Sequence, residues 1–539
     1  MTGAEAMIKC LEAENITKVF GYPGVAIAPF YEGLYNSDIK HILVRQEQNA
    51  GHAASGYARL SRKPAVCVVT SGPGATNLIT ALATAYADSI PIVAISGQVS
   101  SKLLGRDVFQ EADMRGATKS FVKYSYLVKD PDDIPSVFKE AFYIASTGRK
   151  GPVLIDIPMD VQNSTLKKPF VYPDSVHIRG YKPEIKVNMN QIRRVVQALA
   201  QARRPLLCAG GGVILGNAET TIRAFCEKFN IPIVHTMMGM GVIPKSHPLN
   251  FGMLGNNGKP YANNAVEQAD VLIVVGARIA DRAVSKPESL ARRVAVIHID
   301  IDTAEIGKNL GPTIPLVGDV DDIFKILLEE EIRPADPSWI AELEDIKHGT
   351  VDTRVFSDRY VNPNLLVQTL SDKMDDNAIY VADVGQNQLW SADNYIMKDG
   401  RFLTTGGMGT MGYSIPAAMG AKMFAPERQT VAVCGDGAFQ MCMNELATMR
   451  ENNAEIKIVI VRNNYLGLVR EYQYNLYNGH YEGVRLGEWP KYDKIAEAYD
   501  IPFFICSTND ALDETIDAFL AYPGASLMIC DVDSNDRVK

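Results

Sequence analysis

The sequence predicts an α/β protein that contains three doubly wound parallel sheets. Short continuous runs of Val, Ile and Leu recur along its 539 residues, and runs of this kind are typical of parallel strands that are covered on both faces. Stretches of helical length separate the runs, so we expect right-handed crossover connections. A chain of this length also requires about three hydrophobic cores.

Ten apolar runs are the clearest strand candidates: AVCVVTSG, IPIVAISG, GPVLIDIP, PLLCAGGG, ADVLIVVG, VAVIHIDID, AIYVADVG, TVAVCGDG, EIKIVIVRNN and LMICDVD. Two segments rich in proline and polar residues, 163–186 and 332–362, interrupt the alternation and indicate linkers. We therefore expect an N-terminal domain over residues 1–165, a central domain over 185–335 and a C-terminal domain over 360–539.

Composition excludes several classes of function. A net charge of −9 and a pI near 5.5 argue against nucleic acid or an anionic membrane as the main partner. The eight cysteines are scattered singly, which suits a reducing cytoplasm and does not suit a structural zinc site. The first 15 residues look like an amphipathic helix rather than a signal peptide, and no apolar run reaches transmembrane length.

The first and third domains share a weak internal repeat. Residues 65–97 and 430–464 both read as a strand, a G-x-G-A turn, a helix and a second strand. The two copies differ between the glycines of the turn, where the first has Pro73 and the second has Asp436. The difference falls where a ligand would bind, because a strand that ends in a glycine turn before a helix is a ready anion site.

Asp436 and Asn463 predict a magnesium site. Asp436 lies between Gly435 and Gly437, and Asn463 follows 27 residues later at the end of the next strand candidate. One strand–helix–strand unit fills this interval, so both loops should emerge at the same edge of the sheet. A carboxylate and an amide oxygen suit Mg²⁺, which completes its coordination with phosphate and water. A helix cap and an Asn turn would explain each residue singly but not the pair.

Glu47 raises a separate question. It follows the apolar run HILV and precedes a segment of small residues that should pack closely. It is either an ordinary acid in a first helical turn, where the helix dipole favours it, or a functional carboxylate, since a charge entering a packed region otherwise costs free energy.

The motif G-D-G-(x)25-N-N resembles that of thiamine diphosphate (ThDP) enzymes, and the chain as a whole resembles the acetolactate synthase family. The matching stretches run almost end to end: FGYPG, RQEQNAGHAASGYAR, TSGPGATN, SGQV, FQEAD, GPVLIDIP, HIDID, DVGQNQLW and GGMGTMGYSIPAAMGA, besides the GDG block. The resemblance implies pyrimidine-binding, central and diphosphate-binding domains, in that order.

The resemblance also implies roles for individual residues. Glu47 would hydrogen-bond N1′ of the cofactor's aminopyrimidine and so assist removal of the C2 proton. Met411 would support the bent cofactor, and the carbonyl of Gly409 would accept from its 4′-amino group. Asp436, Asn463 and the carbonyl of Tyr465 would bind Mg²⁺. The other expected ThDP-binding residues are Gly24, Gln386, Asn387, Gly435, Gly437 and Ala438, although the family usually has His at 387 and Ser at 438.

The implied reaction decarboxylates pyruvate and transfers the two-carbon unit to a second 2-oxo acid. The product would be 2-acetolactate or 2-aceto-2-hydroxybutyrate, as in branched-chain amino acid biosynthesis. Arg282, in GARIADR, would bind the acceptor carboxylate, unless it is only an exposed loop arginine. Gln110 would line the same cleft as a catalytic residue. Tyr472 stands where biosynthetic enzymes carry Trp, which predicts weak discrimination between acceptors.

FAD is the third cofactor that we expect. Gly210, Gly211 and Gly212 form a strand-end turn that allows close approach of a dinucleotide, and Arg149 and Arg278 match family arginines near the flavin. The same turn would also be explained by packing of a helix on the sheet, and Ala280, Asn256 and Asn257 depart from the FAD-binding pattern.

Relatives assemble the ThDP site between two subunits, which implies a homodimer or tetramer; a small regulatory subunit is a further partner of such enzymes. Among competing functions, a pyruvate oxidase or an acetyl-transferring ThDP enzyme would share the cofactor motifs. An NAD-dependent oxidoreductase needs G-x-G-x-x-G, which neither turn completes. A catalytically inactive regulatory chain is disfavoured because Glu47, Asp436 and Asn463 are all present.

Overall fold

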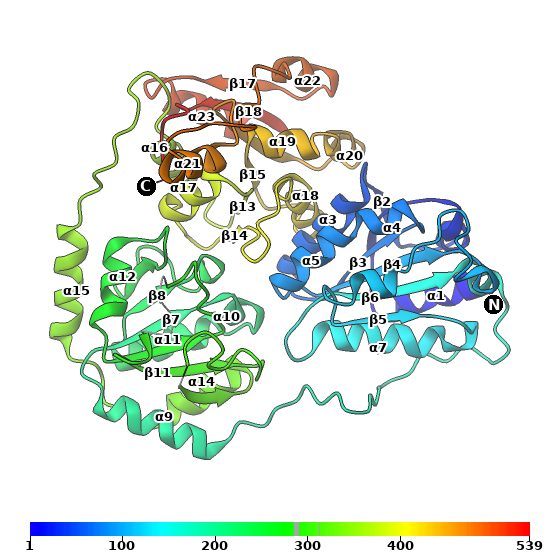
Figure 1. Cartoon of the computed structure of the whole chain (residues 1–539), viewed down its shortest axis with the longest axis horizontal. Helices are drawn as coiled ribbons and strands as arrows, with labels where there is room; N and C mark the ends of the chain where they lie inside the picture. The colour runs from blue at the N-terminus through cyan, green and yellow to red at the C-terminus, as the bar shows by residue number, and fades with distance from the viewer. Residues whose placement is uncertain (285–289, 312, 539) are drawn as a thin grey trace.

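A computed structural model of the chain describes residues 1–284, 290–311 and 313–538. It contains three six-stranded sheets, and every strand pairing in them is parallel. Figure 1 shows three α/β bodies, coloured blue to cyan, green, and yellow to red along the chain. The predicted fold class is confirmed.

The N-terminal sheet has the strand order β2-β1-β3-β4-β6-β5. Its strands are β1 Lys18–Tyr22, β2 Lys40–Leu43, β3 Ala65–Val69, β4 Ile92–Gln98, β5 Tyr124–Leu127 and β6 Val153–Pro158. The helices of this part are α1 Gly3–Ala13, α2 Ala28–Tyr35, α3 Glu47–Ser61, α4 Pro73–Asn77, α5 Ile79–Ala87, α6 Met114–Thr118, α7 Ile134–Ser146 and α8 Met159–Asn163.

The C-terminal sheet repeats that topology, with the order β14-β13-β15-β16-β18-β17. Its strands are β13 Ile379–Ala382, β14 Arg401–Leu403, β15 Thr430–Gly435, β16 Ile456–Arg462, β17 Phe503–Cys506 and β18 Ser526–Asp531. The helices are α16 Pro363–Lys373, α17 Gln386–Asn394, α18 Ser414–Phe424, α19 Asp436–Cys442, α20 Glu445–Glu451, α21 Gly467–Leu476, α22 Tyr492–Ala498 and α23 Leu512–Ala521. The identical order supports the internal repeat.

The central sheet differs, with the order β12-β11-β10-β7-β8-β9. Its strands are β7 Pro205–Ala209, β8 Ile233–His235, β9 Asn250–Met253, β10 Val271–Val275, β11 Ala295–Asp300 and β12 Ile314–Val317. Helices described here are α9 Met189–Gln201, α10 Gly211–Leu215, α11 Glu219–Phe229, α12 Pro260–Gln268, α14 Val320–Glu329 and α15 Pro337–Gly349. Sequential strands extend outward from the neighbours β7 and β10, and such a switch point is where open α/β sheets bind ligands.

All ten predicted strand runs form strands, and the reason is burial on both faces. Every residue of β3, β4, β6, β7 and β10 is buried. The N-terminal segment forms the helix α1, as predicted, and a capping box between Thr2 and Glu5 begins it. In the part of the chain that is described, no helix is both long and apolar enough to span a membrane.

The two proposed linkers behave differently. Residues 166–187 contain no helix or strand, whereas residues 332–362 include the helix α15. Asp336 caps this helix and Pro337 begins it, which the proline-rich composition concealed. Trp339 is buried and donates a hydrogen bond from its indole N–H to the carbonyl of Pro205 (3.1 Å), so α15 packs on the central domain.

Helices α3 and α18 join the N-terminal and C-terminal domains by a close approach of their backbones. A Cβ at Gly56 would overlap the carbonyl of Ala417, and one at Gly420 would overlap the carbonyl of Ala53. Only glycine fits at both positions. The contact fixes α3, whose first residue is Glu47, against the domain that carries Asp436.

Candidate active site

The loops after β15 and β16 lie together at the carboxyl edge of the C-terminal sheet, as predicted. Asp436 is buried, and its carboxylate accepts hydrogen bonds from the backbone N–H groups of Asn464 (2.6 Å) and Gly437 (3.0 Å). Burial raises the pKa of Asp436 to about 6. The side-chain oxygen of Asn463 accepts from the backbone N–H of Tyr465 (3.0 Å). One carboxylate and one amide are thus held at a single point.

The donor atoms at this edge fit Mg²⁺ rather than a transition metal. Within the described ranges, no three His, Cys, Asp or Glu residues are grouped so that they could hold a metal ion. A cation beside Asp436 would therefore rely on one carboxylate together with amide and carbonyl oxygens. Hard cations such as Mg²⁺ accept such a set and complete it with phosphate and water.

Gln386 and Asn387 begin α17 immediately after β13, but their side-chain amides are already engaged. The Nδ2 group of Asn387 donates to the carbonyls of Asp383 (2.9 Å) and Val433 (3.2 Å), and so ties two strand ends together. Gln386 is bonded to neighbouring side chains and to the C-terminal segment. Their contacts with the diphosphate stay predictions.

The segment that carries Gly409 and Met411 folds over the glycine turn at Asp436. Gly409 has φ +67°, a left-handed conformation that favours glycine. A Cβ at Gly437 would lie 3.3 Å from Cε of Met411, so the methionine side chain covers that turn. Ala438 is buried next to it. The predicted pyrimidine support and the predicted diphosphate turn are therefore adjacent.

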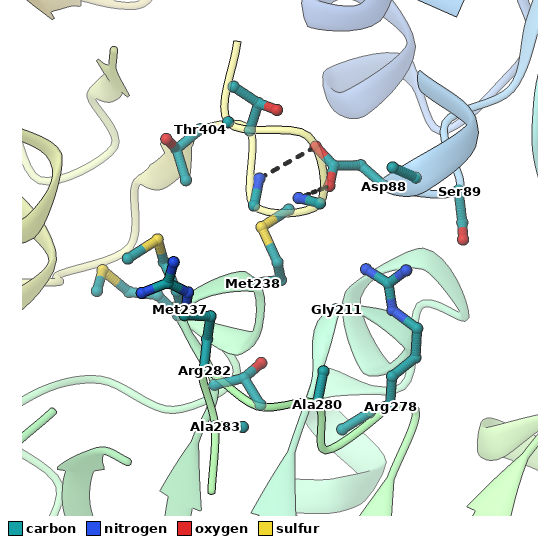
Figure 2. Close-up of a pocket in the computed structure, with 18 of the residues that line it drawn as sticks. Asp88, Ser89, Gly211, Met237, Met238, Arg278, Ala280, Arg282, Ala283 and Thr404 are labelled. Carbon is teal, nitrogen blue, oxygen red and sulfur yellow. Dashed lines mark hydrogen bonds between the residues drawn. The ribbon is translucent and has the colours of Figure 1, made fainter. Parts of the chain in front are cut away.

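Asp88, at the end of α5, holds this segment from the N-terminal domain. Its buried carboxylate accepts from the backbone N–H groups of Gly407 (2.8 Å) and Gly406 (3.3 Å), as the dashed lines in Figure 2 show. It also pairs with the guanidinium of Arg59 (2.8 Å), which is almost fully buried. The hydroxyls of Thr84 and Thr410 add a hydrogen bond of 2.7 Å. Sequence reasoning missed Asp88, because no motif marks it and its partners Gly406 and Gly407 lie 318 and 319 residues away in the chain.

Glu47, Gly24 and Gln110 gather around the turn that follows β3. Glu47 is half-buried and accepts a hydrogen bond from the side-chain amide of Asn77 (3.0 Å). A Cβ at Gly74 would lie 3.3 Å from Glu47 Oε1, and one at Gly72 would lie 2.9 Å from Cβ of Gln110. A Cβ at Gly24 would similarly press on Thr70 at the start of the turn. The N-terminal residues therefore form a half-site of their own.

A cavity of about 1760 Å³ lies where the three domains meet. Its walls include Gly211, Arg278, Arg282 and Gly409, whereas Glu47, Gly24 and Gln110 are not among the described residues that line it. Figure 2 shows Arg278 and Arg282 rising from the central domain toward the segment that Asp88 holds. Of the residues predicted to bind ThDP or its metal, only Gly409 is among the described residues that line this cavity; Met411, Asp436 and Asn463 are not.

The sequence offered two explanations for the three glycines after β7: close approach of a dinucleotide, or packing of a helix on the sheet. Different glycines fit each explanation. A Cβ at Gly210 or Gly212 would collide with Gly276 after β10, so these two serve close packing of backbone on backbone. Gly211 instead faces Met238, 3.1 Å from a Cβ placed there, and both residues line the cavity. The turn thus both packs α10 and forms a cavity wall.

Arg149 and Arg282, two arginines predicted to bind ligands, differ in how strongly they are paired with acidic side chains. Arg149 donates to Asp302 (3.1 Å), Glu305 (3.0 Å) and the hydroxyl of Ser89 (3.0 Å), and joins the N-terminal and central domains. The side chain of Arg282 is 70% exposed, and its ion pair with Asp281 is long, at 3.8 Å. The guanidinium of Arg282 is therefore the better placed of the two to bind an incoming anion.

Three families of known sequence match successive parts of the chain. They are the thiamine pyrophosphate enzyme N-terminal TPP binding domain over residues 1–117, the central domain over 192–327 and the C-terminal TPP binding domain over 383–530. Individual relatives extend the match.

The chain is 44% identical over 514 residues to the "Probable acetolactate synthase large subunit" of Methanocaldococcus jannaschii, which covers 93% of this chain and 87% of the relative. It is 44% identical over 500 residues to the acetolactate synthase large subunit of Corynebacterium glutamicum, with 91% and 80% covered. It is 42% identical over 515 residues to the acetolactate synthase of Arthrospira platensis, with 93% and 89% covered. The chain therefore belongs to the acetolactate synthase large-subunit family of thiamine pyrophosphate enzymes.

Proposed function

We propose that this chain is the catalytic subunit of an acetolactate synthase, which uses ThDP and Mg²⁺ to decarboxylate pyruvate and join the two-carbon unit to a second 2-oxo acid. The main observation in support of this proposal is that the loops after β15 and β16 meet, where the Asn464 N–H donates a hydrogen bond to the Asp436 carboxylate (2.6 Å). The same edge presents Asn463 and Tyr465. This arrangement suits a diphosphate held through Mg²⁺, and the names of the relatives supply the reaction.

When bound, ThDP supplies an acidic carbon whose conjugate base adds to ketones, and an electron sink for decarboxylation. The chain's own residues would orient it. Asp436, Asn463 and the carbonyl of Tyr465 would hold the metal. Met411 would support the bend, and the left-handed conformation of Gly409 would present its carbonyl to the 4′-amino group. Glu47 would hold a proton opposite the pyrimidine ring, as a general acid–base group.

A second copy of the chain would complete the site. The family resemblance implies a cofactor bound between two chains, and this agrees with the cavity within one chain, whose described walls include Gly409 but neither Glu47 nor Asp436. Large apolar side chains near both half-sites are exposed, among them Phe109 (87%), Val25 (75%) and Met408 (52%). We take these side chains to contribute to the interface between chains. A homodimer is the minimum, and a tetramer or an added regulatory subunit is compatible with it.

Arg282 would bind the carboxylate of the acceptor. Its exposed guanidinium lines the cavity together with Tyr472, which is 50% exposed. A planar guanidinium matches a carboxylate through two parallel hydrogen bonds. A tyrosine at 472 should discriminate weakly between pyruvate and 2-oxobutyrate. Competition between equal concentrations of the two acceptors should yield both products, and overwhelming formation of 2-aceto-2-hydroxybutyrate would contradict this.

FAD would occupy the part of the cavity nearer the central domain. The cavity is roomy enough for a dinucleotide, Gly211 and Met238 form one wall, and the Arg278 side chain enters it. The flavin would bind without serving redox chemistry here. Purified protein should be yellow and release about one FAD per chain on denaturation. Fully active colourless protein that added FAD does not affect would contradict the assignment.

Product analysis with pyruvate alone tests the proposed reaction. A synthase forms acetolactate, which converts to acetoin on acidification, whereas a pyruvate oxidase consumes O₂. Acetoin without oxygen uptake would support the proposal, and oxygen uptake without acetoin would overturn it.

We further propose that the domains span residues 1–165, 185–335 and 360–539, which the division of the strands into three sheets supports. We also propose a cytoplasmic location, which the free cysteines support.

A further inference from the structure

We propose that Glu471 is a positioning residue for the metal: it fixes the orientation of two side-chain amides in series, and thereby turns the oxygen of Asn463 toward Asp436. Glu471 lies on α21 and is buried. This inference rests on the proposed function, because it takes Mg²⁺ to bind at Asp436 and Asn463.

The chain of contacts starts at the Glu471 carboxylate. Its Oε2 accepts hydrogen bonds from Nε2 of Gln386 (2.8 Å) and from the backbone N–H of Val538 (3.1 Å). The same Gln386 Nε2 also donates to the backbone carbonyl of Asp536 (3.0 Å). A carboxylate and a carbonyl can only accept hydrogen bonds. Both therefore require the NH₂ end of the Gln386 amide, and its orientation is fixed.

The orientation of Gln386 then determines that of Asn463. With its NH₂ group directed at Glu471, Gln386 presents Oε1 to Asn463, whose Nδ2 donates to it (3.2 Å). The oxygen of Asn463 must consequently point the other way, where it accepts from the Tyr465 N–H (3.0 Å). A carbonyl-type oxygen has two lone pairs, so one remains for a metal next to Asp436.

Gly467 provides an independent indication that the local structure favours the contact between the amides of Gln386 and Asn463. It is the first residue of α21, and a Cβ there would overlap Oε1 of Gln386 and lie 2.7 Å from Nδ2 of Asn463. Its φ is not in the left-handed region, so backbone conformation does not demand glycine. The requirement is space for the two amides to meet.

Groups that orient metal ligands typically change metal affinity 10–100-fold when they are altered. In the isosteric variant Glu471→Gln the new side chain can donate as well as accept, so the carbonyl of Asp536 alone still requires the NH₂ group of Gln386 and the orientation of this amide is held less firmly. The direction of the Asn463 oxygen then depends on the Tyr465 N–H alone. Gly467→Ala should have the same effect by pushing the two amides apart.

The test is the Mn²⁺ affinity of the full chain at a fixed ThDP concentration, read from the EPR signal of free Mn²⁺ and corrected for a protein-free titration. We expect the Kd for Mn²⁺ to rise at least about tenfold in Glu471→Gln and in Gly467→Ala. Two matched controls should bind as the unaltered chain does. Glu445→Gln removes a buried carboxylate that is bonded to Asn49 (2.8 Å) instead, and Gly349→Ala adds a Cβ that meets nothing within 4 Å.

The variant Asp436→Asn separates the inference from the function on which it rests. If Asp436→Asn abolishes Mn²⁺ binding while Glu471→Gln and Gly467→Ala bind normally, the positioning role is wrong and the metal site stands. If Asp436→Asn itself binds Mn²⁺ normally, the proposed metal site is wrong and the inference falls with it. Thermal unfolding of each variant shows that a lost affinity does not reflect a lost fold.

Discussion

The turns that follow β3 and β15 occupy the same place in two sheets of identical strand order, yet they are built for different tasks. After β3 the residue between the glycines is Pro73, which has no side-chain acceptor, and the space over Gly74 is occupied by Glu47. After β15 that residue is Asp436, whose carboxylate is held by backbone N–H groups of its own turn and of the next loop. One turn positions a carboxylate from elsewhere, and the other carries its own.

The comparison shows how a duplicated scaffold diverges. Topology delivers both turns to the carboxyl edge of a sheet, where ligands of α/β proteins bind. The residue between the glycines is Pro73 in one turn and Asp436 in the other, and the separate roles that we propose for the two turns rest on this difference. Function therefore depends on a few residues placed on a shared fold.

The largest effect should follow from Glu47→Gln. An amide cannot give up and retake the proton, and general acid–base groups contribute roughly 10²–10⁴-fold to rate, so acetolactate formation should fall by that order. The fold should survive, because the carboxylate is half-buried and Asn77 is its one side-chain partner among the residues that the structure describes. Initial rates and thermal unfolding would be compared with Glu32→Gln, an exposed acid on α2. Near-normal turnover would remove Glu47 from the site.

A smaller effect is expected from Asp88→Asn, which acts between the two regions. The change leaves Arg59 buried without its ion partner, and breaking such a pair costs about 3–5 kcal/mol. Unfolding free energy should fall, and ThDP should bind more weakly because the segment with Gly409 and Met411 loses its anchor. Asp160→Asn is the control: Asp160 accepts from Ser101 (2.8 Å to the backbone N–H) and pairs with no arginine among the described residues. Equal losses in both variants would contradict the role given to Asp88.

The smallest effect concerns a buried acid of the N-terminal sheet. Burial raises the pKa of Asp156 to about 7, although Ser96 and Gln98 donate to it. Because the folded pKa lies above the ordinary value of 3.8, folding takes up a proton, and stability falls as pH rises from about 4 through 7. The unfolding free energy of Asp156→Asn should therefore change less between pH 5 and pH 7. An unchanged pH profile would show that Asp156 is ionised throughout.

Much of the fold could be predicted from sequence because the central strands are buried on both faces and read as apolar runs. The strands that escaped prediction are short or lie at sheet edges: β1, β5, β8, β9, β12, β14 and β17. In β5, for example, Tyr124 is exposed and none of the four residues is fully buried, so the strand has no continuous apolar run to recognise. The helix α15 escaped because its proline reads equally as a breaker.

For the candidate site, the meeting of the loops that carry Asp436 and Asn463 could be predicted from their spacing, whereas the chemical roles of these residues and of Glu47 stay predictions. The site was not predictable where a residue acts through another. Asp88 and Glu471 lie in stretches with no distinctive motif, and their partners are distant in sequence: Asp88 binds Gly407, and Glu471 binds Gln386. Only the folded chain brings these pairs together.

The central claim is that the N-terminal half-site of one chain serves the C-terminal half-site of another. Coexpression of Glu47→Gln and Asp436→Asn chains, distinguished by two affinity tags, tests it directly. Each variant alone should be nearly inactive, but random pairing into two-fold dimers should give about half mixed dimers, each with one intact site. The mixture should therefore regain about a quarter of the unaltered activity, all of it in the doubly tagged fraction. Doubly tagged dimers no more active than either parent would show that both residues serve a site within one chain.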